Sequence, residues 1–157
     1  MDKVEGFYTI GEILQSLYGD LSGGSPMADK KPNRTESQEM ILLFGWSAAM
    51  SKGIPELESM YHVPNEGKRK PWTGARMKAE GLKKGVPDIC LPVPRNGYHG
   101  LYIEMKSAGG KLRKEQKEWL ERLGRNGYLA VTCHGFEEAR DLILAYLQGT
   151  MSPWQTA

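Results

Sequence analysis

The chain has 157 residues, of which 25% are charged and 39% hydrophobic, the proportions of an ordinary soluble globular protein. This composition excludes the collagen-like and disordered classes. A membrane-spanning class is excluded because no stretch approaches the roughly 18 apolar residues that cross a bilayer. A chain of this length can bury a core without disulfides or a structural metal. Its two cysteines, Cys90 and Cys133, form no CxxC pair and favour a reducing compartment. The N-terminus lacks the order of a secretory signal, so we expect a cytoplasmic protein.

Charge is distributed unevenly although the formal net charge is only +2. Residues 66–84 hold seven basic and two acidic side chains, whereas residues 1–20 are acidic overall. A second basic cluster lies between residues 106 and 117. Such clusters suit contact with a polyanion, although a solvated helix face produces the same pattern.

The first half of the chain predicts helices and one short strand. Residues 6–19 form an amphipathic helical pattern, and residues 22–35 are rich in Gly, Pro and Ser, as linkers are. Thr35 or Asn33 can cap a helix over residues 36–50. Residues 59–63 are typical of a short strand. Residues 72–82 predict a helix with a basic face.

The second half alternates strands and helices. Residues 86–93 predict a strand that their prolines must keep short or near an edge. The Asn96-Gly97 turn leads into a strand at residues 101–106. Side chains on a strand alternate between its two faces, so Tyr102, Glu104 and Lys106 share one face. A helix carrying Leu112, Gln116, Trp119, Leu120 and Leu123, a strand at 128–133 and a helix from Phe136 follow. This interleaving predicts an α/β core, a small mixed sheet flanked by helices. We divide the chain into an extension and linker (1–34), one domain (35–149) and a tail (150–157).

Two acids and a lysine are brought together by this arrangement. Asp88 opens one strand, and Glu104 and Lys106 lie near the end of the next strand across a hairpin. Paired carboxylates offer the hard oxygen ligands that Mg²⁺ or Mn²⁺ prefer, and such a cation activates water and neutralises phosphate charge. Lys106 can orient that water or stabilise the developing charge. Taken singly, Asp88 has a turn cap as its plainer alternative, and Glu104 with Lys106 is better read as a surface pair. The joint arrangement favours catalysis.

These residues resemble the VRR-NUC domain of the PD-(D/E)xK nuclease superfamily. The matching segments are Gly85-Val86-Pro87-Asp88, Tyr102-Ile103-Glu104-Met105-Lys106, Gly110-Lys111-Leu112 with Glu115-Gln116, Gly127-Tyr128, and upstream His62 to Arg69. Together they span about residues 35–148. The resemblance implies a restriction-endonuclease-like core and a metal-dependent DNA endonuclease that is selective for branched, flap or Holliday-junction DNA.

The resemblance also implies further site residues. An acidic residue on the helix at 36–50 would add a metal ligand. The spacing of the family pattern assigns this role to Glu36, and Glu39, one helical turn away, is the competing choice. The Met105 carbonyl would be a backbone ligand. Gln116 would touch the site or the scissile phosphate, although a solvent-facing helix residue is an equally good reading.

DNA is the expected partner, and a set of polar and basic side chains near the catalytic hairpin is expected to follow its phosphates: Asn65, Lys68, Arg69, Lys70, Arg76, Lys78 and Lys111. Short stand-alone members of the family resemble phage-type junction resolvases, which implies a homodimer. The alternative function is a DNA- or partner-binding module that keeps the nuclease fold without catalysis. A sequence-specific restriction-type enzyme ranks lower, because no added recognition domain is visible.

Overall fold

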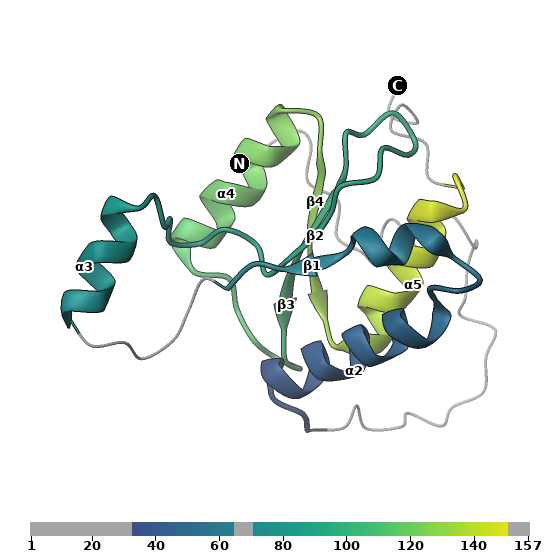
Figure 1. Cartoon of the computed structure of the whole chain (residues 1–157), viewed down its shortest axis with the longest axis horizontal. Coiled ribbons are helices and arrows are strands. Elements are labelled where there is room, and N and C mark those ends of the chain that lie inside the picture. Colours follow the sequence, from purple (N-terminus) through teal and green to yellow (C-terminus); the bar gives the residue numbers. More distant parts are fainter. Residues whose placement is uncertain (1–32, 65–70, 151–157) are drawn as a thin grey trace, which may run out of the picture.

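The computed structural model describes residues 33–64 and 71–150, and within them a four-stranded mixed sheet forms the centre (Figure 1). The strands lie in the order β1 (Tyr61–His62), β2 (Ile89–Leu91), β3 (Leu101–Lys106) and β4 (Leu129–His134). β2 pairs antiparallel with both β1 and β3, whereas β3 and β4 run parallel. A parallel pair needs a crossover, and the helix between β3 and β4 provides it.

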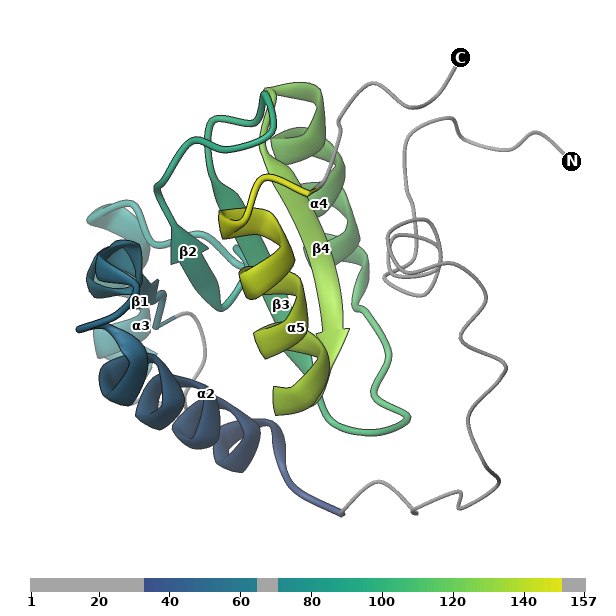
Figure 2. The same ribbon diagram turned by 90° about the vertical axis from the view of Figure 1, so that its right-hand side faces the viewer.

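Helices cover the two faces of the sheet unequally. α2 (Glu36–Met50) and α5 (Phe136–Leu147) lie on one face, and α4 (Lys114–Arg125) lies on the other against β4 (Figures 1 and 2). α3 (Pro71–Ala79) stands away from the sheet on the side of α4, and a short 3₁₀ helix, η2 (Pro55–Ser59), precedes β1 (Figure 1). Among the helices of residues 33–64 and 71–150, none packs directly on the α4-side face around β1 and β2.

The hydrophobic core lies between the sheet and the α2–α5 layer. Leu101, Ile103 and Met105 point into it from β3, and each is at most 1% exposed. Leu142 and Ile143 of α5 meet them from the helical layer. Because side chains on a strand alternate, packing these three residues inward turns Tyr102, Glu104 and Lys106 to the α4 side.

Two caps fix the helical layer. Thr35 accepts a hydrogen bond from the Gln38 N–H (3.3 Å), and Gln38 Oε1 accepts one from the Thr35 N–H (2.9 Å), a reciprocal capping box that begins α2. α5 begins after Gly135, whose φ of 98° suits glycine and which has no side chain to cap with. Glu39 of α2 supplies the missing acceptor, because its Oε2 receives the Phe136 N–H at 2.7 Å.

The structure confirms the predicted fold class and element order. The predicted bounds of the 36–50 helix and the 101–106 strand agree with α2 and β3. β2 covers only three of the residues predicted at 86–93, because Pro87 and Pro92 cannot extend the ladder. The segment predicted as a helix at 6–19 lies outside the described residues. In the described part of the chain, no helix is both long enough and apolar enough to cross a membrane.

The cap that Glu39 provides predicts a specific loss of stability. Replacing Glu39 with Ala leaves the Phe136 N–H without its acceptor and should lower the free energy of unfolding by about 1–3 kcal/mol in urea titrations. Glu36→Ala, in the same helical turn, is the control and should change it by less than about 0.5 kcal/mol. Equal effects of the two variants would contradict the assignment of Glu39 as the cap.

Candidate active site

A buried carboxylate–ammonium pair on the open face of β3 is the centre of the site. Glu104 is 1% exposed and Lys106 is 5% exposed, and the lysine Nζ lies 2.8 Å from Glu104 Oε1. The two residues stand two positions apart on one strand, so they share a face by the period of the strand. Few charged residues are buried this deeply unless they are paired.

Asp88 joins this pair from the start of β2. Its Oδ2 accepts a hydrogen bond from the Met105 N–H at 3.0 Å. Extending the β2–β3 register by two residues sets Pro87 opposite Met105, and proline has no N–H to give. The ladder therefore ends here, the Asp88 side chain takes the Met105 N–H, and the ladder offers no donor to the Met105 carbonyl.

Gln116 ties the buried pair to α4. Its Oε1 accepts the Arg113 N–H at 2.8 Å, and its Nε2 donates to Glu104 Oε1. The side chain is held inside, with the residue 6% exposed. Gly85 makes this approach possible, because a Cβ there would lie 2.6 Å from the carbonyl carbon of Glu115, and its φ is +80°. Gln116 thus both caps the start of α4 and fixes the orientation of the Glu104 carboxylate.

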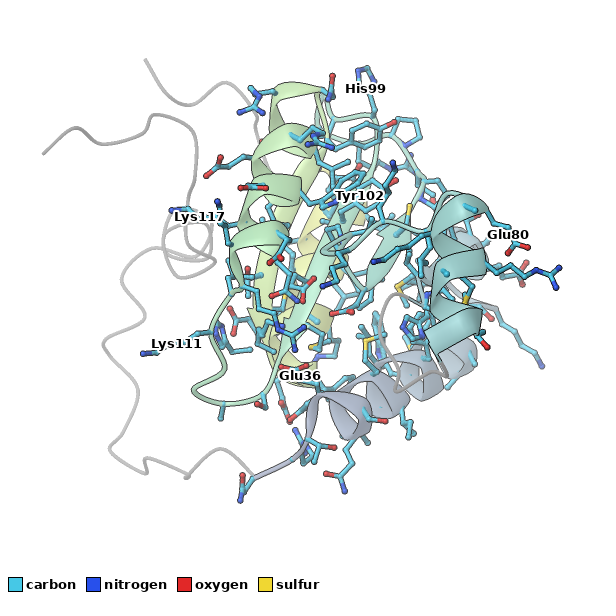
Figure 3. All side chains as sticks on the ribbon, turned by 90° about the vertical axis from the view of Figure 1, so that its left-hand side faces the viewer. Glu36, Glu80, His99, Tyr102, Lys111 and Lys117 are labelled. Carbon is cyan, nitrogen blue, oxygen red and sulfur yellow. The ribbon has the colours of Figure 1, made fainter. Side chains whose placement is uncertain are left out.

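The two candidate acids of α2 differ in position. Glu36 Oε1 lies 3.6 Å from Lys106 Nζ, and its side chain is half exposed at the edge of the site (Figure 3). Glu39 is 3% exposed, and its oxygens are used by Phe136 and by Arg34, whose Nε lies 3.0 Å away. The geometry therefore places Glu36, and not Glu39, beside the buried pair.

Burial and repulsion act strongly on these charges. Burial raises the pKa of Glu104 to about 7, although the Lys106 hydrogen bond opposes the rise, and the Asp88 charge adds to it. Burial also raises the pKa of Asp88, against the stabilising Met105 N–H. Burial acts to lower the pKa of Lys106, but Glu104, Glu36 and Asp88 outweigh it and the pKa rises. The site holds more negative charge than Lys106 compensates.

The available oxygens fit a hard divalent cation for which the protein would supply only part of the coordination shell. Glu104 Oε2 is buried and, among the residues that the structure describes, has no hydrogen-bond partner, which is costly for a carboxylate. Asp88 is near enough for its charge to raise the pKa of Glu104, and the Met105 carbonyl has no ladder donor. Across residues 33–64 and 71–150, no three His, Cys, Asp or Glu side chains form a metal cluster by themselves. Mg²⁺ usually keeps several waters and takes one or two carboxylates, so this limited set remains suitable.

The expected nucleic-acid contacts are only partly within the described residues. Asn65, Lys68, Arg69 and Lys70 lie outside them. Arg76 and Lys78 lie on α3, where Arg76 pairs with Glu80 at 2.8 Å. Lys111 is exposed in the loop between β3 and α4 (Figure 3). None of these three contacts the buried pair.

The comparisons with known proteins identify the family of the domain. The model of the VRR-NUC domain matches residues 47–137. A solved structure described as a VRR_NUC domain protein is 30% identical, with a TM-score of 0.65, and the match covers 74% of this chain and 91% of that one. The chain belongs to the VRR-NUC family. No curated protein matches it.

This membership confirms the resemblance drawn from the sequence and establishes a nuclease-type domain. Asp88, Glu104, Lys106 and Gln116 all lie inside the matched range. Glu36 and Glu39 precede it, so the family match does not choose between them.

Two basic residues near the VRR-NUC site were missed by the sequence analysis. Lys84 and Arg113 line a cavity of about 110 Å³ together with Gly85, Glu115 and Gln116. The sequence signal was present, because Lys84 ends the first basic cluster and Arg113 lies in the second. Their proximity depends on the close contact of Gly85 with α4, which no local pattern reveals.

The raised pKa of Glu104 predicts a pH-dependent stability. The folded state holds the proton more tightly than the unfolded chain, whose Glu pKa is near 4.5, so stability should fall as pH rises from about 4.5 to about 7. The loss is on the order of 2–3 kcal/mol. Glu104→Gln cannot ionise and should be more stable than wild type at pH 8 but not at pH 4.5, in urea titrations with EDTA. Glu118→Gln, at an exposed position on α4, is the control, and a Glu104→Gln curve parallel to that of wild type would contradict the prediction.

Proposed function

We propose that this VRR-NUC protein is a Mg²⁺- or Mn²⁺-dependent DNA endonuclease that hydrolyses phosphodiester bonds. The observation that carries the proposal is the buried Glu104 carboxylate, whose Oε2 has no hydrogen-bond partner within residues 33–64 and 71–150, while Asp88 and Lys106 lie beside it. A site that used these residues for stability alone would also give Oε2 a partner, because a buried polar atom left without a hydrogen bond costs about 1–3 kcal/mol.

The residues that would hold the cation are Glu104, Asp88 and the Met105 carbonyl, with Glu36 at the exposed edge. A bound cation would acidify water and neutralise charge on the phosphate. The protein's part is to fix the donors: Gln116 orients Glu104, and the Met105 N–H orients Asp88. Because the pKa of Glu104 is about 7, its proton competes with a cation, and cation affinity should weaken below neutral pH.

Lys106 acts as a cation and not as a base. Its raised pKa keeps the ammonium protonated at neutral pH, so it can donate hydrogen bonds to water or to a phosphate oxygen. Its Nζ lies between Glu104 and Glu36, 2.8 and 3.6 Å from their nearest oxygens. A phosphate that entered here would meet positive charge at a position otherwise surrounded by carboxylates.

We propose branched, flap or Holliday-junction DNA as the substrate and a homodimer as the active form, in line with the family resemblance. The basic residues Arg76, Lys78 and Lys111, with Asn65 and Lys68 to Lys70, would follow the phosphates. Light scattering at assay concentration tests the dimer, and a monomer that cuts both strands of a junction would contradict it.

Cleavage of labelled four-way junctions, flaps and linear duplex tests the activity. Asp88→Asn, Glu104→Gln and Lys106→Met should each reduce Mg²⁺-dependent nicking by at least about a hundredfold, because each removes charge stabilisation at the reacting phosphate. Glu118→Gln on α4, at a solvent-exposed position, should cut like wild type.

Activity that survives all three substitutions would show that the site is wrong. DNA binding by the wild type without cleavage in Mg²⁺ or Mn²⁺ would contradict the enzyme assignment and leave the non-catalytic binding module.

A further inference from the structure

A row of aromatic side chains crosses the sheet on the same face as the buried pair. Tyr61 of β1 and Tyr102 of β3 are the cross-strand neighbours of Cys90 on β2, one on each side. The Cys90 thiol acts to raise the pKa of both tyrosines, as a group close to the two hydroxyls would. The Tyr128 ring meets Tyr102 edge-on at 5.4 Å, and His99 meets Tyr128 at 5.6 Å. We call Tyr61, Tyr102, Tyr128 and His99 the aromatic row.

The aromatic row is continuous with the active site. Tyr102 precedes Glu104 by two positions on β3, so both point to the α4 side, about 6–7 Å apart along the strand. Figure 3 shows Tyr102 and His99 successively farther along the sheet from Glu36, between α4 and α3. A DNA strand whose phosphate lies at Glu104 and Lys106 would bring the neighbouring nucleotide to Tyr102.

The row is held in place and is accessible. Tyr61 is 49% exposed, His99 is exposed, and Tyr102 and Tyr128 are partly exposed. A Cβ on Gly127 would lie 2.7 Å from the His99 ring, so glycine permits this close packing. The His99 N–H also donates to the Gly127 carbonyl at 2.9 Å. Aromatic side chains fixed in this way lose little freedom on binding a flat ligand.

We propose that the aromatic row binds an unpaired or splayed nucleotide next to the scissile phosphate. Bases inside a duplex are stacked on one another, so an aromatic surface gains a base only where that base has left the stack. Aromatic platforms of this kind tolerate any base, because every base has a π face. The inference rests on the proposed function and deepens it: the substrate class is DNA with a nucleotide out of the stack at the cut.

Fluorescence of 2-aminopurine tests the proposal independently of catalysis. The probe is a duplex with one unpaired 2-aminopurine, compared with the same duplex fully paired, in Ca²⁺ and with the full-length protein. Wild type should quench the unpaired probe and bind it at least about tenfold more tightly than the paired duplex. Tyr61→Leu and Tyr102→Leu should each lose the quenching and most of that preference, while affinity for paired DNA stays within about twofold.

Matched variants separate stacking from other effects. Tyr61→Phe and Tyr102→Phe keep the ring and should retain quenching, and Ile41→Ala, at a 70% exposed position of α2 on the opposite side of the sheet, should behave as wild type. Tyr61 is half exposed on an edge strand, so its variants remain informative even if Tyr102→Leu fails to fold.

The proposal is overturned if wild type binds both duplexes equally, if the Leu variants weaken both equally, or if Phe fails like Leu. If the unpaired probe is quenched as expected but no Mg²⁺-dependent cleavage occurs, the nuclease function is overturned and the aromatic row remains a nucleotide-binding surface. Mg²⁺-dependent cleavage, together with binding and quenching that none of the aromatic-row substitutions changes, would support the nuclease function and overturn the nucleotide-binding proposal.

Discussion

The burial of the Glu104 carboxylate on the central strand is the constraint on which the rest of the site depends. Removing a carboxylate from water costs several kcal/mol, and a single ion pair rarely recovers that cost. Here Lys106 and Gln116 both contact Oε1, while Oε2 has no hydrogen-bond partner in the described part of the chain. The arrangement is therefore poor for stability and suited to receiving a cation. The proposed cation binding would explain a geometry that folding alone would disfavour.

The same strand builds the core and the site. Leu101, Ile103 and Met105 fill the core on one face of β3, and Tyr102, Glu104 and Lys106 occupy the other. Any shift of register by one residue would exchange these two sets, so hydrophobic packing fixes the position of the candidate site side chains. The neighbouring elements add precision, since Pro87 ends the β2 ladder where Asp88 is needed and Gly85 lets α4 approach. Site geometry is in this sense a product of the packing.

The sequence predicted those features that depend on local pattern. The alternation in residues 101–106 indicated β3, and the two candidate caps Asn33 and Thr35 indicated the start of α2, where the structure has Thr35. The order of elements followed from similar local signals. The PD and ExK residues could be placed together because a hairpin joins their strands. The prolines shortened β2 beyond what its apolar residues indicated.

Features that depend on long-range contacts escaped prediction. The choice between Glu36 and Glu39 required knowing that α5 begins at Phe136, 97 residues after Glu39, with a glycine that cannot cap it. The aromatic row joins β1, β3 and the starts of two strands, and only the register of the sheet aligns Tyr61, Cys90 and Tyr102. The cavity beside Gln116 likewise depends on one close contact between distant segments.

Titration with Mn²⁺ followed by electron paramagnetic resonance tests the central claim most directly, because it counts bound cations without requiring turnover. At pH 8 the wild type should bind Mn²⁺ in competition with Mg²⁺, and Glu104→Gln and Asp88→Asn should each lose that binding while Glu39→Gln retains it. A wild type that binds no Mn²⁺, or binding that neither substitution changes, would contradict the account.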